Sequence, residues 1–312
     1  MAVFHDIHQL PEFKNAVLTI GFFDGVHKGH KVILNEVCKH ANQMNATSVL
    51  LTFEPHPRKL LYPDQPLGII TPLHKKLELI EAAGIENIVV VPFTRLFSQL
   101  TADEYIRNFM VGLFHPGSIV IGYDHRFGHD RKGNIELMKQ YAPIYNYSLT
   151  EIPAQLIDEA AVSSTKIRNA LQSGMVADAA QMLGRNYTFT GKVVHGQQLG
   201  RTIGYPTANI EPDDKDQIIP GLGIYAVRVS HKGHQHNGMM SIGYNPTVTN
   251  QKILRIEANI FDFNKDIYGE TIEITMVQKL REEQKFASLD ALKSQLHQDK
   301  LDILRVLGKE LG

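Results

Sequence analysis

The stretch AVLTIGFFDGVHKGH, residues 16–30, decides how the first half of this chain folds. Residues 16–20 are apolar or β-branched and predict a buried strand. The strand breaks at Gly21, and residues 31–44 then repeat apolar side chains at helical spacing. A strand that ends at glycine and restarts as a helix places free backbone N–H groups and the positive end of the helix dipole together. The stretch therefore predicts a phosphate site.

Two histidines distinguish this predicted site. His27 and His30 stand three residues apart around Gly29, so both can face a phosphate bound at the start of the helix. Glycines in a strand–turn–helix are weak evidence alone, and the histidines could instead be polar surface or part of a metal pair, although no third ligand of obvious geometry is nearby. Because Gly21, Asp24 and both histidines lie within this short stretch, we favour a functional site that suits nucleotide chemistry.

Length and composition limit the class of protein. A chain of 312 residues with 43% hydrophobic and 21% charged residues predicts two soluble globular domains. The formal net charge of −1 provides no overall field for nucleic acid or an anionic membrane, so we expect neither as a partner. The single cysteine, Cys38, excludes a disulfide within the chain and fits a reducing compartment. Residues 1–13 read as neither a signal peptide nor a membrane span, so the expected location is cytoplasmic.

The first half continues with alternating strand and helix patterns. Strands are predicted at 47–53, 87–93 and 118–122, and helices at 71–84 and 101–114. Thr71 is expected to cap the first of these helices, and Thr101 with Glu104 has the pattern of a capping box at the second. This alternation predicts an α/β domain with a doubly wound parallel sheet, in which ligands bind beyond the carboxyl ends of the strands.

Three further segments supply candidate site residues in this half. FEPHPR places Phe53, His56 and Pro57 beyond a strand end, although two prolines around a histidine could be only a rigid loop. The loop YDHRFGHDRKGN, residues 123–134, could be solvated surface, or its glycines could let the backbone approach a ligand. VSSTKIRNALQSG, residues 162–174, predicts a helix whose start could hold an anion or simply be capped. The candidates in these last two segments are Asp124, Arg126, Phe127, Ser164, Thr165 and Arg168.

The sequence pattern changes after Asn186. Short β-rich runs separated by glycine turns, at 188–195, 205–210, 223–230, 238–244, 254–261 and 271–278, predict a small six-stranded antiparallel β-barrel. An amphipathic pattern over residues 285–308 predicts a C-terminal helix that closes one side. We place the domain boundary at residue 185, which predicts domains of 1–185 and 186–312.

The most informative run of the predicted barrel is GKVVHGQQLGRTIGYPTANI, residues 191–210. Thr207 and Asn209 are two residues apart, so their oxygens face the same side of an extended strand and suit Mg²⁺, although the motif alone could be a hydrogen-bonding turn. The glycines and the lysine that precede them could form a loop over phosphates. The candidates for that loop are Gly191, Lys192, Gly196 and Gly200.

Several of these segments resemble one family, in order along the chain. GFFDGVHKGH is similar to the HxGH signature of nucleotidylyltransferases and, in the wording G-x-F-D-G-V-H-x-G-H, to the bacterial bifunctional riboflavin kinase/FAD synthetases. FEPHP, the loop 123–134 and SSTKIR resemble the motifs F-x-P-H-P, G-x-D-F-x-F-G and S-S-T-x-I-R of that family, and LGRTIGYPTAN resembles its flavokinase signature. The loop departs from the pattern at His125, where an aromatic residue such as Phe is expected, so the contacts of position 125 stay open.

The resemblance implies two reactions that use ATP. Riboflavin is phosphorylated to FMN in residues 186–312, and FMN is adenylylated to FAD with release of pyrophosphate in residues 1–185. The family likeness also implies Glu257 as the base of the kinase, with Mg²⁺ as its cofactor, and His27, His30 and Arg168 as groups that stabilise charge on ATP. The implied nucleotide-binding residues are Gly21, Phe22, Asp24, Gly29, His30, Asp124, Arg126, Ser164, Thr165, Arg168, Gly191, Lys192, Gly196 and Gly200. The implied metal ligands are Thr207 and Asn209. The implied flavin-binding residues are Phe53, His56, Pro57, Phe127, Glu257, Arg281 and Phe286.

Alternatives remain open from the sequence alone. A glutamate on a strand, such as Glu257, usually faces solvent. The barrel could phosphorylate another hydroxylated substrate, or the protein could bind or sense flavin without turnover. The presence of Glu257 with both histidines argues against a simple binder, which needs neither. The sequence does not determine the oligomeric state.

Overall fold

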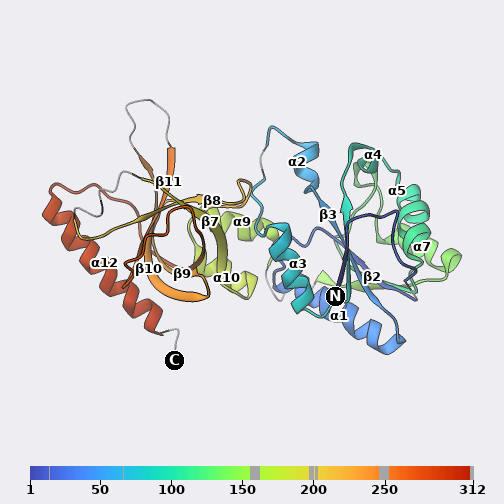
Figure 1. Cartoon of the computed structure of the whole chain (residues 1–312). Coiled ribbons are helices and arrows are strands. Elements are labelled where there is room, and N and C mark those ends of the chain that lie inside the picture. The colour runs from blue at the N-terminus through green and yellow to red at the C-terminus, as the bar shows by residue number, and fades with distance from the viewer. Residues whose placement is uncertain are drawn as a thin grey trace. The chain divides into compact units, whose positions relative to one another are not determined.

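The computed structural model describes residues 1–13, 15–65, 67–154, 162–196, 200, 203–245 and 253–309. The chain forms two compact units, Met1–Ser164 and Thr165–Gly312 (Figure 1). The division of the two activities at residue 185 stays a prediction. Within the described ranges, no helix is both long and apolar enough to cross a membrane.

A parallel sheet is the centre of the first unit. Its six strands in the described residues are β1 (Ala2–Phe4), β2 (Val17–Ile20), β3 (Ser48–Glu54), β4 (Asn87–Pro92), β5 (Ser118–Gly122) and β6 (Ser148–Ile152). The order across the sheet is β1-β4-β3-β2-β5-β6, and neighbouring strands are parallel. The chain runs outward from β2 through β3 to β4 and then returns to the other side of β2 for β5. This reversal between β2 and β5 is the place where doubly wound sheets bind ligands. The predicted fold of the first half is confirmed.

Helices cover both faces of this sheet, because successive strand residues point to opposite sides. Val17 and Leu50 pack with α1 (Lys28–Met44) and α3 (Leu73–Ala82) on one face. Leu18 and Leu51 face the other helical layer. That layer consists of α5 (Ala102–Glu104), the π-helix η1 (Tyr105–Val111), α6 (Gly112–Phe114) and α7 (Ile135–Tyr145). The short elements of this unit are α2 (Pro57–Leu61), α4 (Arg95–Ser98) and the 3-10 turn η2 (His129–Arg131).

Capping contacts explain where two of these helices begin. Thr101 Oγ1 accepts the N–H of Glu104 at 3.2 Å, and the Glu104 carboxylate accepts the N–H of Thr101 at 2.9 Å, so the predicted capping box is present. The expected cap at Thr71 is wrong, because Pro72 is the N-cap of α3 and no side chain caps that helix. The N–H of Thr71 instead donates to the Asp24 carboxylate at 3.1 Å, which ties the start of α3 to the loop after β2.

The loop that follows β5 packs into the core of the first unit. Phe127 is buried, and its ring stacks on Tyr105 of η1 with the centroids 4.9 Å apart. A Cβ on Gly133 would lie 2.4 Å from the Phe127 ring, so glycine is required there. His125 lies beside Phe127, and its buried Nε2 has no hydrogen-bond partner in the part of the chain described. Burial, with a smaller contribution from Arg131, lowers the pKa of His125 to about 4, so its ring is neutral at neutral pH.

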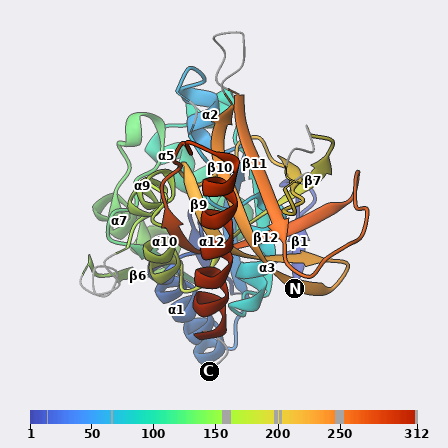
Figure 2. The same cartoon turned by 90° about the vertical axis from the view of Figure 1, so that its left-hand side faces the viewer.

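A closed antiparallel barrel forms the second unit (Figure 2). Its strands are β7 (Tyr187–Val194), β8 (Ala208–Pro212), β9 (Gly223–His231), β10 (His234–Asn245), β11 (Ile253–Ile260) and β12 (Thr271–Arg281). Their order around the barrel is β10-β11-β8-β7-β12-β9, so the predicted six-stranded barrel is confirmed. The predicted C-terminal helix, α12 (Leu289–Lys309), packs Ile303 and Leu307 against Met239 and Val277 on one side of the barrel. Before β7 come α9 (Ser164–Gln172), which begins at the division, and α10 (Val176–Leu183), which contacts β12 and β7.

A buried ion pair joins α12 to the barrel. Asp299 is 2% exposed, and its carboxylate accepts hydrogen bonds from Arg281 Nε at 3.0 Å and from Arg281 Nη2 at 2.7 Å. Gln295 donates to the same carboxylate at 2.9 Å. Removal of one partner from such a pair leaves a buried charge uncompensated, which costs several kcal/mol.

Asp299→Asn is expected to lower the free energy of unfolding of the second unit by about 3 kcal/mol, because it leaves the Arg281 guanidinium without its counter-ion. Asp302→Asn is the matched control on the same helix, since its ion pair with Arg305 is exposed and is worth under about 1 kcal/mol. The chain has no tryptophan, so circular dichroism in urea is the suitable measurement. Equal effects of the two substitutions would contradict a structural role for the buried pair.

His125→Phe is expected to make the first unit less sensitive to acid. The His125 pKa is about 4 in the folded chain and 6.5 in the reference state, so the unfolded chain binds more protons between these values. Stability therefore falls as the pH drops through that window, by at most about 3 kcal/mol. Phenylalanine removes this loss. Thermal unfolding at about pH 7.5 and about pH 5 should give a smaller difference in Tm for the variant than for the wild type. Identical differences would show that the His125 ring is not enclosed.

Candidate functional site

The carboxyl ends of β2 and β3 bring the first predicted site residues together. The N–H of Gly21 donates to the carbonyl of Leu51 at 3.0 Å, which keeps the two segments paired beyond the end of β2. The exposed ring of Phe22 then lies 5.5 Å from the Phe53 ring and 5.2 Å from the His56 ring, measured between centroids. A cluster of rings of this kind suits a flat aromatic ligand. The flavin contacts of Phe53 and His56 stay predictions.

The loop between β2 and α1 has a strained backbone. Phe23, Gly25 and Val26 have φ values of +49°, +89° and +39°. Such values are costly for residues that carry a side chain, and they persist only where the surroundings enforce them. Phe23 and Val26 are buried, so packing contributes to this enforcement. Left-handed residues in a turn direct backbone N–H groups to one side, which is the geometry of an anion-binding concavity.

Asp24 anchors this loop to the segment that precedes α3. Its carboxylate is buried and accepts the N–H groups of Ile70 and Thr71, each at 3.1 Å. The hydroxyl of Ser164 donates to the backbone carbonyl of Asp24 at 3.0 Å. The structure therefore gives Asp24 and Ser164 a role in holding the loop. Their contacts with a nucleotide stay predictions.

The two histidines stack at the start of α1. His27 is the N-cap, and its Nδ1 accepts the N–H of His30 at 3.2 Å, which assigns the ring proton of a neutral His27 to Nε2. The ring centroids are 3.6 Å apart, and the rings are 14° from parallel. Gly29, which lies between the two histidines in sequence, is buried. Burial, then the charges of His27 and Lys76, lower the pKa of His30 well below its usual value. His30 is therefore a neutral hydrogen-bonding group at neutral pH rather than a fixed cation.

Lys76 was not among the residues predicted from the sequence. This lysine is 6% exposed on the buried face of α3, and its Nζ donates to Thr52 Oγ1 at 3.0 Å and to the carbonyl of Phe22 at 3.3 Å. Burial lowers the pKa of Lys76, while the charges of Glu54 and Asp24 oppose this shift. The available signal was a lysine within the apolar stripe of a predicted helix.

The other predicted residues of the first half lie in different surroundings. Pro57 is buried and begins α2. Asp124 and Arg126 are exposed on the loop after β5. Thr165 and Arg168 belong to the second unit, so their relation to the histidines stays a prediction.

In the second unit, strand register brings Thr207, Asn209 and Glu257 together. Asn209 on β8 is the direct partner of Glu257 on β11, so the two side chains lie on the same face of the sheet. Thr207 Oγ1 donates to Glu257 Oε2 at 3.3 Å. Arg255 Nη1 lies 3.7 Å from Glu257 Oε1. Hydroxyl, amide and carboxylate oxygens on one face form a donor set that fits a hard cation such as Mg²⁺.

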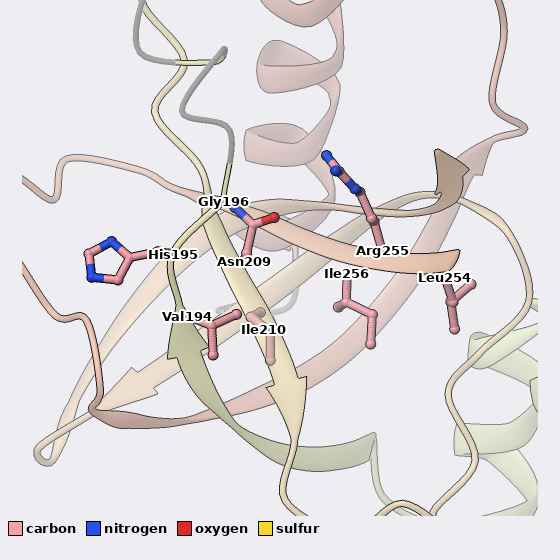
Figure 3. Close-up of a pocket in the computed structure, with 8 residues that line it drawn as sticks. All are labelled: Val194, His195, Gly196, Asn209, Ile210, Leu254, Arg255 and Ile256. Atoms are coloured by element: carbon pink, nitrogen blue, oxygen red, sulfur yellow. The ribbon is translucent and has the colours of Figure 1, made fainter. Parts of the chain in front are cut away.

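A pocket of about 310 Å³ opens beside this cluster. Figure 3 shows Asn209 and Arg255 with their polar ends on one side of the strands, whereas Ile210 and Ile256 point to the other side. Arg255 and His195 were not predicted from the sequence. The His195 ring stacks on Tyr268 with the centroids 3.8 Å apart. The lining residues are Val194, His195, Gly196, Asn209, Ile210, Leu254, Arg255 and Ile256.

Two of the predicted glycines shape the surroundings of Asn209. A Cβ on Gly196 would lie 2.1 Å from Asn209 Nδ2, so only glycine lets the backbone pass there. The carbonyl of Gly200 accepts the N–H groups of Ile203 at 3.2 Å and Tyr205 at 2.9 Å, which closes the turn before residues 206–209. Residues 197–199 and 201–202 of the predicted phosphate loop lie outside the described residues.

Gly191 and Lys192 lie within β7 rather than in a loop. A Cβ on Gly191 would lie 2.5 Å from the Ile210 side chain and 2.8 Å from the carbonyl oxygen of Glu211, so the packing of β7 on β8 requires this glycine. Lys192 is exposed. The nucleotide contacts of both residues stay predictions.

Arg281 is engaged by α12. Besides its hydrogen bonds to Asp299, the guanidinium lies 5.8 Å from the centroid of the Phe286 ring, and Nη1 donates to the carbonyl of Glu282 at 3.0 Å. These contacts hold the end of β12 and the following segment against α12. A contact of Arg281 or Phe286 with flavin stays a prediction.

Comparisons with known proteins match both halves of the chain. Residues 9–166 match the FAD synthetase family, and residues 183–307 match the riboflavin kinase family. The bifunctional riboflavin kinase/FMN adenylyltransferase of Listeria monocytogenes is 39% identical over 289 residues, which cover 92% of this chain and 91% of that protein. The protein of the same name from Escherichia coli K12 is 35% identical over 305 residues, which cover 97% and 96%.

A solved structure agrees with these matches in fold. The crystal structure described as a macrolide-efflux protein from Streptococcus pneumoniae aligns with a TM-score of 0.85 and 33% sequence identity, over 96% of each chain. The words "macrolide-efflux protein" describe the Streptococcus pneumoniae protein and not this chain. The resemblance found in the sequence motifs is confirmed: this chain belongs to the family of bifunctional riboflavin kinase/FMN adenylyltransferases.

Proposed function

We propose that this chain phosphorylates riboflavin with ATP to give FMN and ADP, and then adenylylates FMN with a second ATP to give FAD and pyrophosphate. The observation that carries the proposal is the strand register that sets Glu257 opposite Asn209 and within reach of Thr207, in a chain whose two halves match the two families. A cytoplasmic location, and the absence of nucleic-acid and membrane partners, stay predictions from composition.

The kinase reaction needs a group that accepts a proton. The terminal hydroxyl of the ribityl chain attacks the γ-phosphorus, the new O–P bond forms as the bond to the ADP oxygen breaks, and the hydroxyl proton is lost. Glu257 accepts that proton, which is worth about 10²–10⁴-fold in rate. Thr207 and Asn209 would hold Mg²⁺ through their oxygens, and a bound Mg²⁺ supplies neutralisation of phosphate charge. The Thr207 hydroxyl also orients the Glu257 carboxylate through its hydrogen bond.

The adenylyltransferase reaction needs no base, because the FMN phosphate is already ionised at neutral pH. A phosphate oxygen of FMN attacks the α-phosphorus of ATP, and pyrophosphate leaves. The chain then has only to position the phosphates and stabilise their charge. The strained loop after β2, the N-terminal end of α1, the neutral ring of His30 and the ring of His27 supply N–H donors for this purpose. Arg168 is the proposed cation.

Glu257→Gln is expected to lower FMN formation by about 10²–10⁴-fold and to leave the conversion of FMN to FAD unchanged, because only the kinase reaction needs a base. The reciprocal variant is His27→Asn with His30→Gln, in which asparagine keeps an N-cap on α1. It should lose FAD formation and keep FMN formation. Chromatographic separation of the flavins formed from riboflavin or from FMN, with ATP and Mg²⁺, measures both reactions. Parallel loss of the two reactions in either variant would contradict the assignment, and a wild type that binds flavin without turnover would favour a sensor.

Gly196→Ala is expected to lower the riboflavin kinase activity by about 10²-fold, because the new Cβ would lie 2.1 Å from Asn209 Nδ2 and would displace that side chain. Gly308→Ala is the matched control, since nothing lies within 4 Å of a Cβ at that position. Steady-state rates over a titration of Mg²⁺ should show a higher requirement for the metal in Gly196→Ala only. A wild-type Mg²⁺ requirement in this variant would exclude Asn209 as a ligand.

A further inference from the structure

Lys76 is a buried cation beneath the loop that joins β2 to α1. Its Nζ donates to the carbonyl of Phe22 and to the hydroxyl of Thr52, and that hydroxyl lies 3.2 Å from the same carbonyl. Thr52 is fully buried and Lys76 is 6% exposed. Two donors therefore converge on one backbone carbonyl at the end of β2.

This arrangement is costly for the stability of the fold. No carboxylate among the described residues lies within 4.0 Å of the Lys76 ammonium, although the charges of Glu54 and Asp24 act on it from a greater distance. A buried ammonium without a contacting counter-ion loses its hydration without full compensation. An apolar side chain of similar length would fill the same space at a lower cost. Packing alone therefore does not explain why a charged side chain occupies position 76.

The peptide group that Lys76 holds belongs to the loop of the predicted phosphate site. In a trans peptide the C=O and the next N–H point in opposite directions. Because the Phe22 carbonyl accepts from Lys76 and Thr52, the N–H of Phe23 points away from these two donors. Phe23 has a φ of +49°, so this orientation is maintained against backbone strain.

Lys76 also acts on the histidine pair through its charge. Its positive charge is one of the causes that lower the pKa of His30, after burial and His27. The charged or titratable groups that face this region are His27 from the start of α1, Asp24 from the loop and Glu54 from the end of β3. Lys76 thus favours the neutral form of His30, and its effect does not depend on contact with that ring.

We propose that Lys76 is a positioning residue for adenylyl transfer: its ammonium fixes the Phe22 carbonyl and so aims the Phe23 N–H at the phosphates of ATP. This inference rests on the proposed adenylyltransferase activity of the first unit. Lys76 acts through the loop backbone and does not touch the substrate.

The test compares Lys76→Met, which keeps the length of the side chain without its charge, with Lys76→Arg and Lys75→Met. Lys75 is the matched control, because it is the preceding residue of α3 and its ion pair with Glu78 is on the surface. Lys76→Met should lower kcat for the conversion of FMN to FAD by about 10²-fold, as expected for misplacement of a donor by about 1 Å. Lys76→Arg should recover part of this loss. Lys75→Met, and the riboflavin kinase rate of every variant, should stay at the wild-type value.

A second readout separates positioning from simple destabilisation. Removal of the Lys76 charge should move the NMR titration midpoint of the His30 imidazole to higher pH, which loss of stability alone would not do. Thr52→Val removes the hydroxyl beside the Phe22 carbonyl and should lower the same rate by a smaller factor, so the test can be decided even where Lys76→Met does not fold. A wild-type kcat in Lys76→Met overturns the inference. If Lys76→Met does not fold, a wild-type kcat in Thr52→Val overturns it. A wild type that makes no FAD from FMN overturns the proposed function instead.

Discussion

The hydrogen bond from Lys76 to the Phe22 carbonyl is the contact on which the first site depends. β2 ends at the point where the strand order reverses, so the loop that follows it is open to a ligand on one side. Left-handed conformations at Phe23 and Val26 would relax if nothing restrained them. Lys76 restrains the loop through a carbonyl, and Asp24 restrains it through the N–H groups of the segment before α3. The backbone of the predicted phosphate site is therefore restrained before any ligand binds, which is the condition for electrostatic stabilisation without reorganisation.

The second site depends on a different constraint, the register of the barrel strands. Glu257 meets Asn209 because β8 and β11 pair at those residues, and a slip of one residue would turn the Glu257 carboxylate into the barrel. Closure of the barrel prevents such a slip, since β11 is also paired with β10 along its other edge. No strained backbone is required at Glu257. The two units thus position their candidate site residues in two ways: the first by a strained and anchored loop, the second by the register of its strands.

Sequence periodicity predicted most of the fold because the sheet of the first unit is buried on both faces, and such strands read as continuous apolar runs. The helix α7 and the strand β6 were not predicted, since Pro143 interrupts the helical pattern and β6 buries fully only Ile152. Lys76 was missed for a related reason: one polar residue in an apolar stripe looks like a break in the pattern, and its partners Thr52 and Phe22 are distant in sequence. Family motifs supplied candidate residues. The ion pair of Arg281 with Asp299, however, depends on how α12 packs on the barrel, and no local sequence pattern predicts that packing.

The electrostatics of the histidine pair agree with the proton balance of the two proposed reactions. Two imidazolium rings 3.6 Å apart would repel strongly, and burial adds to the cost of charging either ring. A site that relied on charged histidines would lose its positive groups as the pH rose through their pKa values. Adenylyl transfer moves no proton from FMN, so nothing in that step requires His27 or His30 to titrate. In the proposed scheme, the neutral His30 ring and the buried Lys76 ammonium give the first site a potential that does not depend on a charged His30, and the proton transfer is assigned to Glu257 in the other unit.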